Sequence, residues 1–362
     1  MKKLILYLMT CILLLSYNNV VYCDEGTFSV CSIVSYSISY DESLSCVYLP
    51  CTGNAQSLYL NVVDPCTLQI YKTYQFDGLI QDAYAIDNSS KLLIILSELD
   101  GNSSTEEGKL VEIDYAAGNT LRSLNLDRSP EVMRIDPSEN YAYVALGLMD
   151  PYISGDIIKI SLSTFQIVDE TVFGDDVDDM AISPDGSKLY VKTENIYWEH
   201  PSVGIWGIGV FDTSDLELIS RFPVLTSPSE IELNSDGSRL YIGSHNYERT
   251  DSGADIYVVD TSTNTIINKL RFFHNDTEMG TSCLQYSCIT NKLYCTAAPD
   301  IDGIFEYSNL IMELDLYDYS YSFFEMGSSD LGLMTLAEDA NMCRLFAIET
   351  EGTPVVHYMD VP

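Results

Sequence analysis

Acidic residues recur at one register of this chain, and their spacing could build a cation site. Asp82, Glu131 and Asp178 each stand five residues before the first residue of a turn that recurs along the sequence, and Asp179 and Glu230 lie close to the same register. Carboxylates gathered at one end of a channel would bind Ca²⁺ or another divalent cation and would raise one another's pKa values by repulsion. The alternative is a solvated acidic rim, since the residues lack the spacing of an EF-hand loop.

A second candidate set combines aromatic and basic side chains in long polar stretches between predicted strands. Its members are Trp198, His200, His245, Arg249 and His274. Such residues on loops of a rigid scaffold suit recognition of a protein or a carbohydrate ligand. The alternative is that the aromatic rings fold over the scaffold as a small core of their own.

Catalytic signatures are sparse. The chain has no GxSxG elbow, no P-loop, no HExxH motif and no CxxCH heme site. An enzyme here would depend on the acidic residues and the histidines, as in a lactonase-like or other metal-assisted hydrolase. The spacing of these residues does not require one.

The elements that must position both sets come from an internal repeat. In its clearest copy, Ser183–Val191, an apolar run leads into a Pro-Asp-Gly turn and then into a second strand, which is a β-hairpin signal. The turn's first residue and an apolar residue seven positions later mark each copy. The marker pairs are Asp41 with Tyr48, Asp87 with Ile94, Asp136 with Tyr143, Ser183 with Tyr190, Asn234 with Tyr241, Ser287 with Tyr294 and Asp339 with Phe346. A period near 50 residues is typical of propeller blades.

A second marker, a strand that ends in Asp before a short polar turn, follows each hairpin. Tyr257–Ile267 is its clearest copy. Each unit therefore has four predicted strands, except the last, which lacks one. The stretch 27–30 near the start of the chain is predicted to supply that missing outer strand and so to close the ring. The predicted fold is an all-β, seven-bladed propeller of four-stranded antiparallel blades.

The two markers resemble the halves of the YVTN β-propeller repeat, as Ser183–Val191 and Ile256–Thr265 show. That repeat occurs in surface-layer and secreted proteins and is related to lactonase-type seven-bladed propellers. Residues 174–272 match it well, and the other units match in pattern more than in letters. The resemblance implies the fold strongly and the function weakly, because this fold serves many functions.

The charge balance narrows the class of partner. The 362 residues include 54 acidic and 18 basic side chains, a formal charge of −36. Nucleic acid and anionic membranes are disfavoured, because both attract basic surfaces. Residues 1–23 read as a secretory signal peptide, with Lys2 and Lys3 before a short apolar run, and no later stretch is apolar enough for a membrane helix.

The number of cysteines is consistent with export from the cytoplasm. Eight of the ten lie after the signal peptide, where an oxidising compartment favours disulfides over free thiols. Cys283 with Cys295, across one hairpin, is the favoured pair. Three glycosylation sequons begin at Asn88, Asn102 and Asn275 and matter only in a eukaryotic source.

Together these features predict one domain, residues 24–362, that is exported to the cell exterior or surface, or to the periplasm of a Gram-negative cell. The predicted function is non-enzymatic binding or scaffolding by a monomer through its loop-rich face. The alternative is hydrolysis at the acidic mouth of the central channel.

Overall fold

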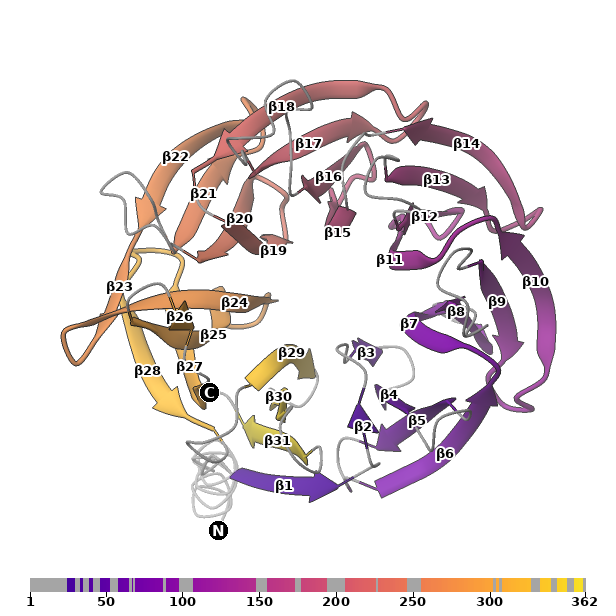
Figure 1. Cartoon of the computed structure of the whole chain (residues 1–362), viewed down its shortest axis with the longest axis horizontal. Helices are drawn as coiled ribbons and strands as arrows, with labels where there is room; N and C mark the ends of the chain where they lie inside the picture. The colour runs from indigo at the N-terminus through magenta and orange to yellow at the C-terminus, as the bar shows by residue number, and fades with distance from the viewer. Residues whose placement is uncertain are drawn as a thin grey trace, which may run out of the picture.

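The computed structural model is all-β, with strands arranged around a common centre (Figure 1). Up to residue 52 it describes only the strands. From residue 58 onward it describes the chain except at 65–66, 68, 87–88, 98–106, 148–154, 173–176, 194–205, 226, 246–254, 302–303, 306–307, 327–332, 340–343, 350–354 and 361–362. The predicted signal peptide and most of the long connections lie outside the described residues. Within the described part, no helix is long and apolar enough to cross a membrane.

The first three sheets follow one another along the chain. Blade one contains β2 (Ile33–Val34), β3 (Ser39–Asp41), β4 (Cys46–Thr52), β5 (Leu58–Asp64) and β6 (Gln69–Phe76). Blade two contains β7 (Leu79–Ile86), β8 (Lys91–Ser97), β9 (Gly108–Asp114) and β10 (Thr120–Leu126). Blade three contains β11 (Pro130–Ile135), β12 (Tyr141–Leu146), β13 (Asp156–Ser161) and β14 (Gln166–Val172).

The remaining sheets continue the same order. Blade four contains β15 (Val177–Ile182), β16 (Lys188–Thr193), β17 (Trp206–Asp212) and β18 (Leu218–Val224). Blade five contains β19 (Ser227–Leu233), β20 (Arg239–His245), β21 (Ile256–Asp260) and β22 (Thr265–Leu270). Blade six contains β23 (Phe272–His274), β24 (Thr277–Ser287), β25 (Lys292–Ile301), β26 (Ile304–Phe305), β27 (Leu310–Asp315) and β28 (Tyr321–Glu325). The terminal sheet contains β29 (Leu333–Asp339), β30 (Arg344–Glu349), β31 (Val355–Asp360) and β1 (Glu25–Ser29).

The antiparallel order within these sheets, first strand nearest the centre and fourth at the rim, is that of a β-propeller (Figure 1). The cores lie between blades, as β8 shows. Leu92 and Ile94 pack into the core shared with blade one, whereas Leu93 and Ile95 pack into the core shared with blade three. Because successive side chains of a strand point to opposite faces, a strand between two neighbours must be apolar at every position.

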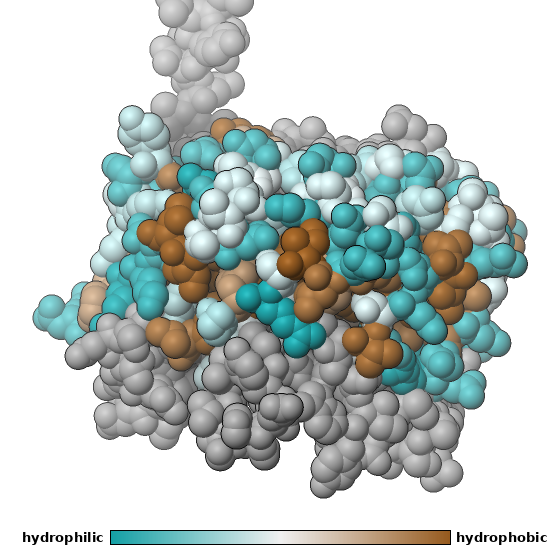
Figure 2. Space-filling view, turned by 90° about the horizontal axis from the view of Figure 1, so that it is seen from above, coloured by the Kyte–Doolittle hydropathy of each residue, from teal (hydrophilic) through white to brown (hydrophobic). Residues whose placement is uncertain are grey.

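The outermost strands face solvent and are less apolar. Exposed hydrophobic side chains on them include Leu121 of β10, Ile167 and Val168 of β14, and Leu218 and Ile219 of β18. Figure 2 shows the hydrophobic residues of the rim as separate groups among hydrophilic ones. On the face in this view the rim is therefore a mixed surface and not one continuous apolar patch.

Side chains of one blade also hold the outer turn of the next. The carbonyl oxygen of Thr213, in the turn between β17 and β18, accepts bonds from Lys159 Nζ at 2.6 Å and from the Tyr143 hydroxyl at 3.2 Å. One blade further on, the carbonyl oxygen of Thr261 accepts a bond from Lys188 Nζ at 2.8 Å. These buried polar contacts fix how neighbouring blades meet, which apolar packing alone leaves less specific.

Two glycines of the recurring turn give a first testable prediction. Gly186 and Gly237 both have left-handed backbone, with φ of 71° and 68°. A Cβ atom on Gly237 would lie 2.5 Å from Pro184 Cδ, whereas one on Gly186 would lie 3.4 Å from Pro137 Cδ. We expect Gly237→Ala to reduce the free energy of unfolding by about 2–3 kcal/mol and Gly186→Ala by about 1 kcal/mol, because only the former adds a clash to the backbone strain. Urea denaturation measures both values, and equal losses would contradict the role of the clash.

Candidate functional site

The innermost strands carry most of the predicted acidic residues at β-bulges. The pairing register shifts between Ile80 and Asp82 in β7 and between Val177 and Asp179 in β15. In β19 it shifts across the segment that contains Glu230. A β-bulge changes the direction of the side chain that it carries. These carboxylates therefore depart from the regular in-and-out alternation of their strands and reach the neighbouring blade.

Each of the three acids accepts a backbone N–H from the next blade. Asp82 Oδ2 lies 3.3 Å from the Met133 nitrogen. The carboxylate of Asp179 accepts the Ile231 N–H at 2.8 Å, and that of Glu230 accepts the Leu284 N–H at 2.8 Å. The innermost strand has a free edge, and its amides need acceptors that no further strand provides. The carboxylates thus satisfy the inner edges and link consecutive blades.

Arg134 of β11 forms salt bridges with two of these carboxylates. Its Nη2 donates to Asp179 Oδ1 at 2.7 Å, and its Nη1 lies 3.5 Å from Asp82 Oδ2. Its Nε donates to the Met180 carbonyl at 2.6 Å and its Nη1 to the Met133 carbonyl at 2.8 Å. One guanidinium thereby joins blades two, three and four, in a geometry that only the planar five-donor group of arginine provides.

Five charged residues on these strands form the inner wall of the propeller. They are Asp82, Arg134, Asp179, Glu230 and Glu232. Burial raises the pKa of Asp82, although the charge of Arg134 opposes that effect. Burial disfavours the charged form of Arg134, but the carboxylates of Asp179 and Asp82 outweigh it and raise the pKa of this guanidinium.

The two glutamates of β19 hold protons near neutral pH. Burial, with the charge of Asp179, raises the pKa of Glu230 to about 7. Burial raises the pKa of Glu232 to about 8, although the positive charge of Arg134 opposes it. The inner wall can therefore lose protons between about pH 7 and 8, and its negative charge grows over that range.

Cys283 lies next to the inner wall, and its side chain is a thiol. A hydrogen bond joins the Cys283 side chain to Glu230, and burial together with the nearby Glu230 charge raises the pKa values of Cys283 and Cys295. Both residues are thiols in the structure, so the predicted Cys283–Cys295 disulfide is not formed. Cys295 pairs with Leu284, and Cys283 lies in the bulge beside it, where its amide donates to Thr296 Oγ1 at 3.0 Å. The other cysteines after residue 23, Cys288 apart, lie outside the described side chains.

The structure corrects the register that linked the acidic residues. The first residue of the turn pairs with the residue five positions later, as Asp136 does with Tyr141, and in blade two this pair is Ile86 with Lys91. Asp87 is therefore the second residue of the blade-two turn and not the first. The position that the acidic residues share lies four residues before the first residue of each turn. It holds Asp82, Val132, Asp179, Glu230 and Cys283.

The predicted acidic residues divide accordingly. Asp82, Asp179 and Glu230 come together on the inner wall. The exposed Glu131 occupies the bulge of β11, where its carboxylate lies against Gly147. Asp178 belongs to β15, but its side chain is not among those described. In the described part of the chain, no three His, Cys, Asp or Glu side chains are grouped as metal ligands.

Arg134 and Glu232 were missed by the sequence reasoning. Both stand two residues before the recurring turn, a second register at which the other described blades carry Tyr84, Ala181 and Gln285. A scan of that register for charged residues on otherwise buried strands would have found them. The inner wall is thus made from two registers of the same repeat.

Most of the predicted ligand-binding residues lie outside the described part of the chain. Trp198, His200 and Arg249 fall outside the described residues, and His245 ends β20 with its side chain undescribed. His274 lies at the rim, where its ring contacts Phe323 of the outermost strand β28 at a centroid distance of 5.0 Å. The clustering of this set therefore stays a prediction.

Comparison with solved structures identifies the fold. The chain superposes on the β-propeller domain of Cps50 (Swd1) from Myceliophteria thermophila with a TM-score of 0.65 and 10% identity, covering 94% of this chain and 100% of that one. The fold is that of a β-propeller. Hydrazine synthase of Kuenenia stuttgartiensis gives a TM-score of 0.62 at 12% identity, over 86% of this propeller and 91% of that chain. Identities this low support the shared fold alone.

Sequence relatives are distant. No family model matches the propeller. The uncharacterized protein YncE of Salmonella typhi is 23% identical over 203 residues, which cover 56% of this chain and 52% of that protein. YncE of Salmonella typhimurium is 22% identical over the same shares. The chain spans about half the length of the curated relatives it matches. These uncharacterized relatives support a propeller architecture but assign no function.

Proposed function

We propose that this propeller is a secreted, non-enzymatic binding protein whose ligand presents a basic group to the inner wall. The observation that carries the proposal is the pair Glu230 and Glu232, which can lose protons near neutral pH beside an arginine already paired with Asp82 and Asp179. Asp82 and Asp179 already form salt bridges with Arg134, whereas Glu230 and Glu232 form none within the described part of the chain, so the glutamates are the groups left to gain a cationic partner.

The finer architecture belongs to the same proposal. We infer seven blades of the YVTN type in one ring, with residues 1–23 as the signal peptide. The pairing of β1 with β31 over Glu25–Ser29 supports closure of the ring by the N-terminal strand. A formal charge of −36 favours solubility and basic partners, and both properties suit an exported binding protein.

The partner, either a protein or a carbohydrate-bearing molecule, is predicted to bind at the long connections between strands. Trp198, His200, His245 and Arg249 stay predictions for that loop surface. Ca²⁺ binding by the acidic residues also stays a prediction, and Ca²⁺ would compete with a basic group for the same carboxylates.

A hydrolase at the inner wall is the second candidate, favoured by one observation. A carboxyl group with a pKa of about 7, such as that of Glu230, can donate and accept protons near neutral pH. Turnover of a lactone and ester panel that is lost in Glu230→Gln would support this candidate over simple binding.

The binding proposal is tested with N-acetylargininamide as the probe, because its guanidinium keeps one positive charge from pH 6 to pH 9. We expect its affinity, measured by isothermal titration calorimetry, to rise about tenfold from pH 6 to pH 9 as Glu230 and Glu232 lose protons. Glu232→Gln should remove most of that rise, and Ca²⁺ should compete with the probe.

The matched control is Glu217→Gln, which removes the same charge from an exposed turn of blade four. It should leave the affinity and its pH dependence unchanged. If both variants weaken binding equally, the general negative field of the protein attracts the probe, and the inner wall is not the site. Absence of N-acetylargininamide binding at pH 9 would reject the proposal.

A further inference from the structure

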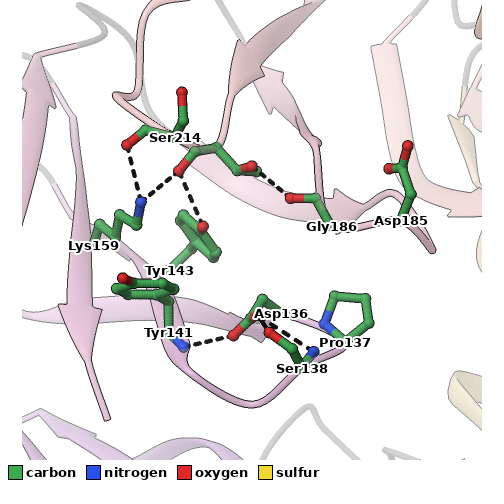
Figure 3. A pocket seen from close by; sticks show the side chains of 10 residues that line it. Asp136, Pro137, Ser138, Tyr141, Tyr143, Lys159, Asp185, Gly186 and Ser214 are labelled. Carbon is green, nitrogen blue, oxygen red and sulfur yellow. Dashed lines mark hydrogen bonds between the residues drawn. The ribbon is translucent and has the colours of Figure 1, made fainter. Parts of the chain in front are cut away.

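A cavity of about 360 Å³ lies between the turns of blades three and four, apart from the inner wall (Figure 3). The residues that line it come from the first turn of blade three, from β12 and β13, and from two turns of blade four. They are Asp136, Pro137, Ser138, Tyr141, Tyr143, Lys159, Asp185, Gly186, Thr213 and Ser214. Its size falls in the range of small-molecule sites, and polar groups converge on it from two blades.

The cavity exists because blade three departs from the pattern of blade four. In blade four Lys188 begins the second strand and its Nζ bonds to Thr261 of the next blade. Val210 of β17 pairs with Tyr190 as Lys159 of β13 pairs with Tyr143, so Val210 holds the position that Lys159 holds in blade three. In blade three Tyr141 begins the second strand, and the cation that bonds to the next blade is Lys159, on the third strand. The lysine has thus moved one strand outward, and an aromatic ring stands in its former place.

The turns are also further apart at this junction. A Cβ atom on Gly186 would lie 3.4 Å from the ring of Pro137, but one on Gly237 would lie 2.5 Å from the ring of Pro184 at the equivalent point of the next junction. The same pair of turns therefore meets less closely where the cavity lies. Two separate observations thus account for the cavity at this junction. One is the exchange of tyrosine and lysine, and the other is the wider gap between the turns.

Lys159 offers a hydrogen-bond donor to the cavity. It is 7% exposed, its Nζ bonds to the carbonyl oxygens of Thr213 at 2.6 Å and Ser214 at 3.1 Å, and it lies 4.3 Å from the ring centroid of Tyr141 (Figure 3). An ammonium group has three N–H donors, and the third has no acceptor among the described residues. The hydroxyl of Tyr141 likewise has no partner in that part of the chain.

Carboxylates supply the acceptors. Asp136 is buried and uses both oxygens within its own turn, on the Tyr141 amide and on Ser138. Asp185 is exposed and lines the cavity; its Oδ1 accepts bonds from Ser183 and Ser187, and its Oδ2 accepts none within the described part of the chain. With one ammonium and two carboxylates, the lining disfavours an anion. A ligand must accept from Lys159 and donate to Asp185, which a neutral polyol does with its hydroxyl groups.

We infer that the cavity between blades three and four is a binding site for a neutral saccharide, which places its hydroxyl groups between Lys159 and Asp185 and its ring against Tyr141. The site shares no residue with the inner wall. Either site can therefore fail its test while the other stands.

The test is saturation-transfer NMR and calorimetry on the whole chain with a panel of neutral mono- and disaccharides. The decisive variant is the double substitution Tyr141→Lys with Lys159→Val, which copies the arrangement that blade four already carries at Lys188 and Val210. It keeps a lysine for the bond to Thr213 while removing the aromatic ring and the free donor from the cavity. We expect at least one saccharide to bind the unaltered protein and its affinity to fall tenfold or more in the variant.

Two controls keep the result interpretable. Lys188→Gln alters the equivalent position of the next junction and should leave saccharide affinity unchanged. Thermal melting should show that the double variant folds; if it does not, Asp185→Asn on the exposed edge takes its place and should weaken binding tenfold or more. Absence of binding across the panel, preference for an amino acid or phosphate over every saccharide, or unchanged affinity in the folded variant would overturn the inference.

Discussion

Arg134→Met should reduce the free energy of unfolding by about 3 kcal/mol at pH 7. The substitution keeps an unbranched side chain of similar length but removes every donor. Asp82 and Asp179, with side-chain exposures of 21% and 10%, would lose their counter-ion, and the Met180 carbonyl would lose its 2.6 Å partner. Removing one member of a partly buried ion network is costly because the two carboxylates left behind have no other compensating cation in the described chain. Urea denaturation at constant pH measures the loss.

The chain offers a matched control in Arg239. Its side chain is 34% exposed, as that of Arg134 is, and it pairs with Asp260 at 3.0 Å in blade five. That pair lies at a turn and has no second carboxylate partner in the described structure. Arg239→Met should cost less than about 1 kcal/mol, as exposed ion pairs do. Similar losses in the two variants would mean that Arg134 acts as a surface pair and not as the link between three blades.

The repeat made most of the architecture predictable. An apolar run, a Pro-Asp-Gly turn and a second apolar run specify a hairpin by local chemistry, and a period near 50 residues then implies a circular array of sheets. The hairpins of blades three, four and five occur where the markers placed them, as the turn bonds of Asp136, Ser183 and Asn234 show. Those predictions succeeded because they depend on contacts within a few residues.

The site was less predictable, for a physical reason. Blade two has Ile86 at the position where the other turns begin with a polar residue, so Asp87 displaced the frame by one residue. In a strand, one residue reverses the face on which a side chain lies. The bulges add a further shift that no local signal marks. The pairing of Arg134 with Asp82 and Asp179 depends on three blades at once, and sequence spacing does not encode such contacts directly.

The second large effect concerns pH. Glu230 and Glu232 have folded-state pKa values of about 7 and about 8, above the ordinary value of 4.5. Between about pH 5 and pH 8 the folded protein thus holds protons that the unfolded chain has released. Stability must fall as pH rises through this window, because the proton-richer state is favoured at lower pH. Full linkage of the two shifts would give about 6 kcal/mol between pH 5 and pH 8.5. Because both side chains are partly exposed and solvent screens them, we expect a loss on the order of 3 kcal/mol, measured by urea denaturation at half-unit steps of pH.

The double variant Glu230→Gln with Glu232→Gln separates this cause from the charge of the whole surface. Glutamine cannot ionise and can still meet the amide of Leu284, so the variant should be nearly as stable as the unaltered protein at pH 5 and more stable at pH 8.5. The groups that face the pair, Asp179, Arg134 and Cys283, remain in place. If the variant lost stability between pH 5 and pH 8.5 as steeply as the unaltered protein, the pH dependence would come from general repulsion among the 54 acidic residues, and the inner wall would not be the proton-binding centre.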